Sequence, residues 1–260
     1  SSAQTVAEPA MGTLGARRQK LKTVLLQNAG GSPPHSLLGV RELEQPKVAA
    51  VFEPSAAAVR WRRIQLEMGS TQKVAVLMAE PLARPTGAGH PAVLVLHSTG
   101  KSKEYIAEHL ERFARKGYVA AAFDARYHGE RALAGLGIAG LSHLDLASVG
   151  PELLQAILDS EAARLKVYHS ALVRAWKTGA ERPFLYDTVA DAICVVDYLA
   201  TRHGLIDPKR IGVTGVSLGG MHAWLLAVAD ERIAVAAPAI GVHSFRHALE
   251  NGIWGARVDT

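Results

Sequence analysis

A short apolar strand, a glycine-flanked turn and a helix follow one another between residues 210 and 226, with Ser217 at the turn. The turn has the pattern Gly-x-Ser-x-Gly, in which Gly215 and Gly219 stand two residues before and two residues after the serine. A turn this tight leaves no room for a β-carbon at those two positions. The pattern therefore predicts a strand-to-helix turn in an α/β sheet, with the serine hydroxyl held clear of the strands.

Ser217 is a candidate nucleophile because of this turn. The backbone N–H of Leu218 lies at the positive end of the following helix, where it could stabilise a carbonyl oxygen that becomes an oxyanion. We expect Trp224, Leu225 and Val228 to form the apolar face of that helix. The alternative is a plain glycine-rich turn with a solvent-facing serine, since the motif also occurs by chance. The strand before the turn and the helix after it favour the catalytic interpretation.

A second strand–helix–strand unit precedes this turn. Residues 92–96 form a continuous apolar run, which is typical of a central parallel strand buried on both faces. After the loop 97–100 we expect a helix capped by Ser102, and then a further apolar strand over residues 118–123. Two parallel strands joined by a helix at this spacing predict a right-handed crossover connection.

Other patterns predict the elements around this unit. Alternation over residues 61–67 and 73–79 is typical of a β-hairpin. A long helix after Pro151 should stop at Gly179, a second helix should run over residues 184–201, and a last strand should run over 233–242.

The chain is expected to have two parts. Residues 1–60 contain a basic stretch and a cluster of glycine, serine and proline, and we expect a partly ordered N-terminal appendage. Residues 61–260 would form the core, with a cap-like insertion over 131–182 above the carboxyl ends of the strands. The alternative for this insertion is a packing element that never meets substrate.

Charge and composition exclude several classes of protein. The net charge of +5 comes from residues 1–63, which hold nine Lys and Arg against four Asp and Glu. We interpret this arm as a solvated basic tail and not as a surface for nucleic acid or anionic lipid, because it is short and lacks interleaved aromatic residues. No apolar run is long enough to span a membrane, and the single Cys194 forms no intrachain disulfide. We expect a cytoplasmic protein, with import into an organelle left open.

Three segments together resemble the α/β-hydrolase superfamily. Residues 94–100 are similar to its strand and His-Gly oxyanion loop, with Ser98 at the usual glycine, and residues 215–220 resemble its nucleophile elbow. Residues 124–131 resemble the Asp-x-Arg-x-His-Gly segment of the dienelactone hydrolase, acetyl xylan esterase and prolyl oligopeptidase-like branches. The run 184–257 is also similar to uncharacterised plant-type members. The resemblance covers about two thirds of the chain and implies an α/β-hydrolase fold, with a mostly parallel sheet and flanking helices.

The resemblance also directs attention to the loop after the central strand. We expect the N–H of Thr99 to be the second oxyanion donor, with Ser98 as the nearer alternative. His97 is interpreted as a residue that braces this loop.

The catalytic acid and base are harder to place. In the superfamily both follow the serine, yet only 43 residues follow Ser217, and Asp230 and Asp259 are poor candidates for the acid. The candidate bases are His128, with a structural role as its alternative, His222, with a packed or surface role as its alternative, and His243, which follows a strand but has no convincing acid partner. We expect the acid and the base to lie beyond Thr260, in a chain that is incomplete at its C-terminus.

These patterns predict a serine hydrolase that acts on carboxylic esters or related acyl compounds of small size, with no cofactor. The pair His243 and His247 lacks a third metal ligand, and no phosphate-binding loop is present. The alternatives are a truncated non-catalytic chain, or a peptidase or thioesterase of the same fold. The oligomeric state stays open.

Overall fold

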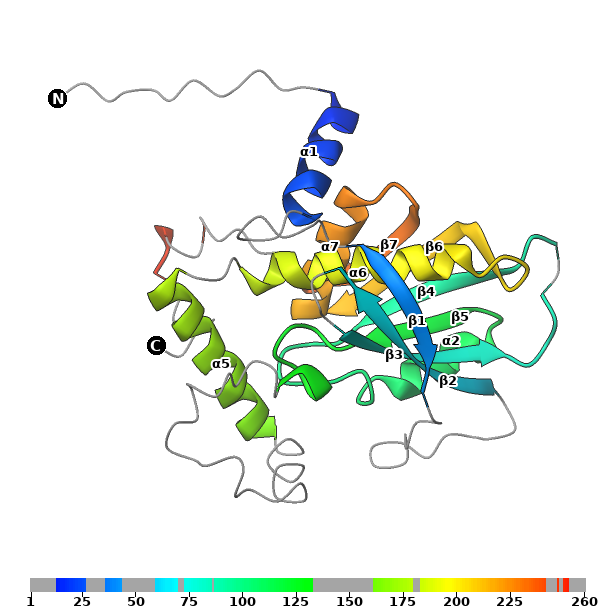
Figure 1. Cartoon of the computed structure of the whole chain (residues 1–260), viewed down its shortest axis with the longest axis horizontal. Helices are drawn as coiled ribbons and strands as arrows, with labels where there is room; N and C mark the ends of the chain where they lie inside the picture. Colours follow the sequence, from blue (N-terminus) through cyan, green and yellow to red (C-terminus); the bar gives the residue numbers. More distant parts are fainter. Residues whose placement is uncertain are drawn as a thin grey trace.

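The computed structural model describes residues 13–26, 36–43, 59–69, 73–85, 87–132, 161–179, 183–241, 247 and 250–252. Its centre is a seven-stranded sheet with the order β1-β2-β3-β5-β4-β6-β7 (Figure 1). The strands are β1 (Leu37–Glu42), β2 (Val59–Met68), β3 (Lys73–Pro81), β4 (His90–Leu96), β5 (Val119–Phe123), β6 (Ile206–Val216) and β7 (Ile233–Ala239). The predicted α/β architecture is confirmed.

Four neighbouring strands, β5, β4, β6 and β7, run parallel, while β1, β2 and β3 extend the sheet as antiparallel strands. The predicted hairpin of β2 and β3 is confirmed, as is the parallel pairing of β4 with β5 across the connecting helix. β4 lies between β5 and β6, and six of its seven residues are buried, as its continuous apolar run predicts.

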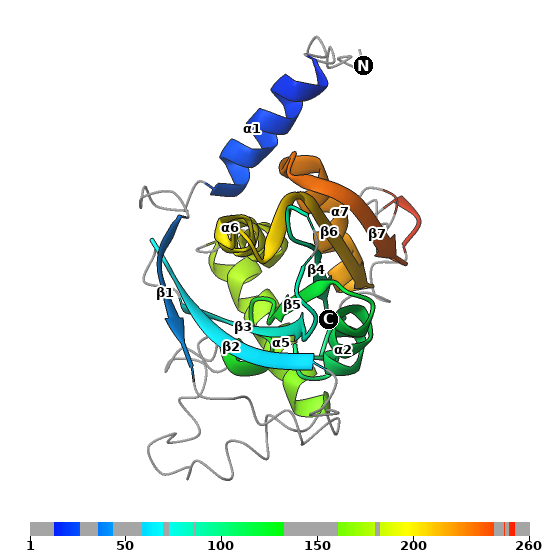
Figure 2. The same cartoon turned by 90° about the vertical axis from the view of Figure 1, so that its right-hand side faces the viewer.

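Helices cover both faces of the sheet (Figure 2). They are α1 (Leu14–Leu26), α2 (Ala107–Arg115), α5 (Glu161–Thr178), α6 (Phe184–Thr201) and α7 (Leu218–Ala229), with a short 3-10 helix, η2 (Gly129–Arg131). Alternate residues of β4 point to opposite faces, so Leu94 packs with residues of α6 and α7, whereas Val93 and Val95 pack with residues of α2. The two apolar layers explain why this strand has no polar alternation.

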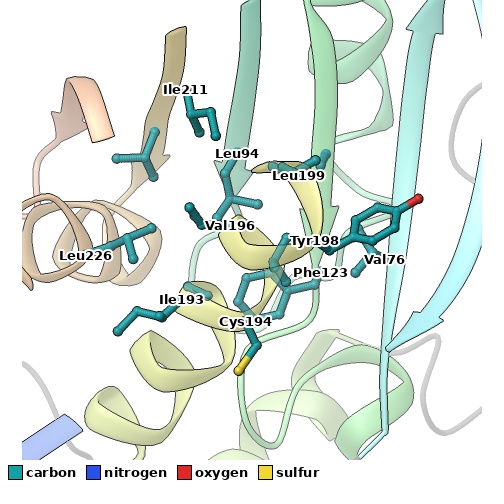
Figure 3. Close-up of a cluster of buried hydrophobic side chains, with 14 of the residues drawn as sticks. Val76, Leu94, Phe123, Ile193, Cys194, Val196, Tyr198, Leu199, Ile211 and Leu226 are labelled. Carbon is teal, nitrogen blue, oxygen red and sulfur yellow. The ribbon is translucent and has the colours of Figure 1, made fainter. Parts of the chain in front are cut away.

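The larger layer surrounds α6, whose predicted bounds are confirmed. Ile193 and Val196 face Leu94 and Phe123 of the sheet, and Cys194 lies among them (Figure 3). The Cys194 side chain is fully buried, and burial raises the pKa of its thiol to about 12. Cys194 is therefore a packed apolar residue of the core.

Two details differ from the sequence-based predictions. α2 begins at Ala107 without a side-chain cap, so the predicted cap at Ser102 is wrong. Lys103, the residue after Ser102, is instead tied into the core. The buried face of α7 includes Ala223 and Leu226, whereas Trp224 is 53% exposed. Leu225 is half-buried and packs against the core, so the predicted apolar face is correct at Leu225 and wrong at Trp224.

The described parts of the N-terminal region contact the sheet and its helices. β1 pairs with β2, and the side chain of Leu25 at the end of α1 is fully buried.

The helix α5 ends at Gly179 as predicted, with φ at +60°, while residues 133–160 lie outside the described residues. The division at residue 60 and the cap-like role of residues 131–182 remain predictions. Among the described helices, none combines the length and apolar character needed to cross a membrane.

Candidate active site

The turn between β6 and α7 holds Ser217 in a rare backbone conformation. β6 ends at Val216, α7 begins at Leu218, and Ser217 has φ +55° and ψ −115°. A residue other than glycine with positive φ costs about 1–3 kcal/mol and persists only where its surroundings enforce it. Here the N–H of Ser217 donates to the carbonyl of Ala239 at 2.9 Å, while the carbonyl of Ser217 accepts from the N–H of Met221 at 3.0 Å.

The glycines on both sides of the serine are required by close backbone contacts. A β-carbon on Gly215 would lie 2.4 Å from the carbonyl oxygen of Gly219, and one on Gly219 would lie 2.1 Å from the carbonyl oxygen of Leu96. These contacts place the first turn of α7 directly against the end of β4. The loop that follows β4, which contains Thr99, therefore lies beside the serine turn.

Thr99 and Leu218 both offer backbone N–H groups at this junction. Both residues are half-buried, as is Ser217. Within the part of the chain that the structure describes, neither N–H is engaged by another protein group. Leu218 is also the first residue of α7, where the helix dipole favours negative charge. The two residues have the surroundings that oxyanion donors need, but their catalytic use remains a proposal.

His97 braces the loop, in agreement with its interpretation from the sequence. Its Nε2 accepts the N–H of Ala125 at 3.0 Å, so its proton lies on Nδ1, which donates to the carbonyl oxygen of Ser98 at 2.9 Å. The peptide unit is planar and trans, so fixing the Ser98 carbonyl directs the Thr99 N–H the opposite way. Burial lowers the pKa of His97, which keeps the ring neutral.

His128 and His222 are also buried, and this argues against either as the base for Ser217. His128 shares a short contact between Nδ1 and the carbonyl of Arg126, at 2.8 Å, and its ring packs on Tyr168 with centroids 4.6 Å apart. Burial, together with the neighbouring His97, lowers the pKa of both His128 and His222 to about 3. The packed roles weighed from the sequence fit both residues.

The other candidates for the acid and base give no catalytic pair. Asp230 follows the far end of α7 and forms an ion pair with Arg232, so its carboxylate is occupied there. His243 and Asp259 lie outside the described residues. The described residues include no group of three or more side chains that could hold a metal ion. A hollow of about 550 Å³ along α5 is lined by none of the predicted site residues.

The sequence analysis missed the polar network that holds the loop after β5. Asp124 is buried and pairs with Lys103, whose Nζ lies 2.8 Å from Oδ2, while Asp191 of α6 pairs with Arg126 and Arg131. Burial acts to raise the pKa of Asp124, but the charge of Lys103 and the two hydrogen bonds from Lys103 outweigh it, and the pKa lies below its usual value. The Asp-x-Arg-x-His-Gly segment indicated that this loop is important, but the sequence did not show that Lys103 and Asp191 are the partners of its charged residues.

Comparisons with known proteins agree with this architecture. A family model described as the prolyl oligopeptidase family matches residues 171–254. The Bacillus subtilis protein named "Putative hydrolase YtaP" is 40% identical over 47 residues, which are 18% of this chain and 15% of that protein.

Two solved structures match most of the chain. The acetyl xylan esterase from Paenibacillus sp. R4 has a TM-score of 0.55 and 16% identity, with 97% of this chain and 70% of that chain covered. A "putative acetyl xylan esterase" from Bacteroides fragilis has a TM-score of 0.57 and 15% identity, with 85% of this chain covered. The match spans about half of the Bacteroides protein, 52%. At these identities the likeness establishes the fold.

Proposed function

Because the chain has the α/β-hydrolase fold, we propose that it is a serine hydrolase that acts on carboxylic esters or related acyl compounds, with Ser217 as the nucleophile. The observation that carries the proposal is the junction of β4, β6 and α7. There, Ser217 has a positive φ, and among the described residues no backbone acceptor is found for the N–H groups of Leu218 and Thr99. The matches to the hydrolase and to the prolyl oligopeptidase family support the same class of reaction.

The proposed reaction has two steps. In the first, Ser217 Oγ bonds to the carbonyl carbon, the carbonyl oxygen becomes an oxyanion, and the N–H groups of Leu218 and Thr99 stabilise it. The bond to the leaving oxygen then breaks as this oxygen takes up the proton that the base removed from Ser217, which releases the alcohol and leaves an acyl-enzyme. In the second step water adds to the acyl carbon and releases the acid and free Ser217. A general base must take the hydroxyl proton, and we assign it to none of the buried described histidines.

We expect a fluorophosphonate probe to label this chain at Ser217, because the probe reacts with a serine that is activated and beside an oxyanion site. Ser217→Ala should lose labelling by at least about 1,000-fold, since the nucleophile is removed. Intact-mass measurement and gel fluorescence would follow the reaction. Ser102→Ala is the matched control, as a nearby half-buried serine outside the turn, and it should label at the unchanged rate. Absence of labelling on the folded, unmutated chain would instead support the non-catalytic alternative.

A peptidase is the second candidate, and the match of residues 171–254 to the prolyl oligopeptidase family favours it. A panel of p-nitrophenyl esters, acyl thioesters and peptide p-nitroanilides separates the three acyl classes. We expect kcat/KM to be highest for the esters. Faster cleavage of the anilides, lost again in Ser217→Ala, would assign the site to a peptidase.

A further inference from the structure

The loop that carries Thr99 is held at both of its ends by the loop that follows β5. On one side, the N–H of Ala125 donates to His97. On the other side, the N–H of Lys103 donates to Asp124 Oδ1 at 2.8 Å, and the Lys103 ammonium donates to Oδ2 at the same distance. Thr99 therefore lies between two anchors that belong to one neighbouring segment.

The buried carboxylate of Asp124 is closely surrounded by backbone atoms. It accepts a third hydrogen bond from the N–H of Glu130 at 3.1 Å. Gly129 has φ +50°, and a β-carbon there would lie 2.2 Å from the carboxylate carbon of Asp124. The chain thus bends tightly around Asp124, which only glycine permits at this position.

The Lys103 ammonium is likewise enclosed, and three carboxylates contact it. Its side chain is 0% exposed, and Nζ lies 2.8 Å from Glu104 and 2.9 Å from Glu130 in addition to its contact with Asp124. Glu130 in turn pairs with Arg63 of β2 at the surface. A fully buried lysine is exceptional, because the charge loses its hydration and the desolvation penalty can exceed the gain from pairing. A well-packed apolar pair would serve stability as well, so stability alone does not account for these charges.

We propose that the buried Asp124–Lys103 pair is a positioning device that holds the Thr99 loop in register with Ser217, so that the Thr99 N–H meets the developing oxyanion. Neither residue touches substrate. The proposal rests on the proposed function of Ser217 and Thr99. The ion pair fixes direction as well as distance, since Asp124 binds both the backbone N–H and the side chain of the same residue.

The double variant Lys103→Met/Asp124→Asn tests this role. Methionine keeps the length of the side chain and asparagine keeps the shape of the carboxylate, so no fully buried charge is left unpaired. Glu104 and Glu130 also lose the Lys103 ammonium, but both carboxylates are partly exposed to solvent. We expect the maximal rate of fluorophosphonate labelling to fall by about 100-fold, because a displaced donor or a shift of about 1 Å costs that much. The probe concentration at half-maximal rate should stay within about twofold, since ground-state binding is not what the loop supplies.

The matched control is Asp230→Asn/Arg232→Met, which removes another buried carboxylate and its cation at the far end of α7. Urea denaturation of both double variants would show that each is folded. The control should label at the unchanged maximal rate, whereas a role limited to stability would affect both variants alike. A maximal rate for Lys103→Met/Asp124→Asn within twofold of the unmutated chain would overturn the proposal.

A second measurement keeps the proposal testable if the unmutated chain does not label. The N–H of Lys101 donates to the carbonyl of Ser98 at 3.2 Å, so its hydrogen exchange reports the order of the Thr99 loop. Loss of the Asp124–Lys103 pair should speed hydrogen exchange at the Lys101 N–H by at least about tenfold, which corresponds to about 1.4 kcal/mol of local stability. If the unmutated chain does not label, the proposed function fails. Unchanged hydrogen exchange at Lys101 in the double variant would separately contradict the positioning role of the Asp124–Lys103 pair.

Discussion

Replacing Gly219 by alanine is expected to destabilise the folded chain by at least about 3 kcal/mol, the upper part of the range for overpacked sites. The new β-carbon would lie 2.1 Å from the carbonyl oxygen of Leu96 and 2.7 Å from that of His97. Both contacts are with backbone atoms, which cannot turn aside as the end of a flexible side chain can. α7 would have to move away from β4, and the serine turn would move with it.

Gly15→Ala is the matched control for this substitution. Gly15 is also a helical glycine, but a β-carbon there meets nothing within 4 Å. Alanine in the exposed helix α1 should be neutral or stabilising by up to about 1 kcal/mol. Urea denaturation followed by circular dichroism would compare the two variants. An unchanged midpoint for Gly219→Ala would contradict the packing of α7 against the end of β4.

Acidification is expected to remove about 4 kcal/mol of folding free energy between pH 7 and pH 5, through His128 and His222 alone. Burial is the main reason that each has a pKa of about 3 in the folded chain, against 6.5 when unfolded. Below about pH 6.5 these two histidines therefore bind protons in the unfolded chain, whereas in the folded chain they stay neutral down to about pH 3. Stability is complete above that pH and falls by about 1.4 kcal/mol per pH unit for each histidine until about pH 3. His97, whose pKa is also lowered, adds to the loss.

The charged groups around these two rings do not change the direction of the effect, which is a loss of stability as the pH falls. His222 is faced by His97, His128 and Asp191, and His128 is faced by His97, Asp124, Arg131 and the ring of Tyr168. The pKa of Asp124 lies below 3.8, so that carboxylate titrates below the measured range.

Urea denaturation at half-unit steps of pH would give the slope of stability against pH. His222→Leu removes one titrating ring, and its slope between pH 7 and pH 5 should fall by about 1 kcal/mol per pH unit, averaged over that range. An equal slope in this variant would show that His222 is charged or exposed in the folded chain.

Periodicity and turn chemistry were sufficient to predict the core of the fold. The hairpin of β2 and β3, the helix over 184–201 and the parallel strands around β4 are confirmed because each has a strong local pattern. The cap at Ser102 was wrong because residue 103 is held by a partner 21 positions away, which no local rule reports. For the same reason, the pairing of β1 with β2 could not be read from the weak pattern of residues 37–42.

The candidate site was predictable only where chemistry is encoded by adjacent residues. The glycines around Ser217 indicate the turn, and the structure shows the contacts that require them. The pair of Asp124 and Lys103 was missed because a lysine is ordinarily a surface residue, and its burial depends on two loops meeting in space. The catalytic roles of Ser217, Leu218 and Thr99 remain predictions that the labelling experiments test.

The place of β4 between β5 and β6 has a consequence for how the chain folds. β4 and β6 pair at Leu96 and Gly215, which are about 120 positions apart, so this contact forms late. At a synthesis rate of about 5–20 residues per second, β4 waits roughly 6–24 seconds for its neighbour. During that interval the edge of β4 that will face β6 has no partner, and the turn that carries Ser217 has not yet been synthesised. We therefore expect the turn that carries Ser217 and the closure of the core to form together.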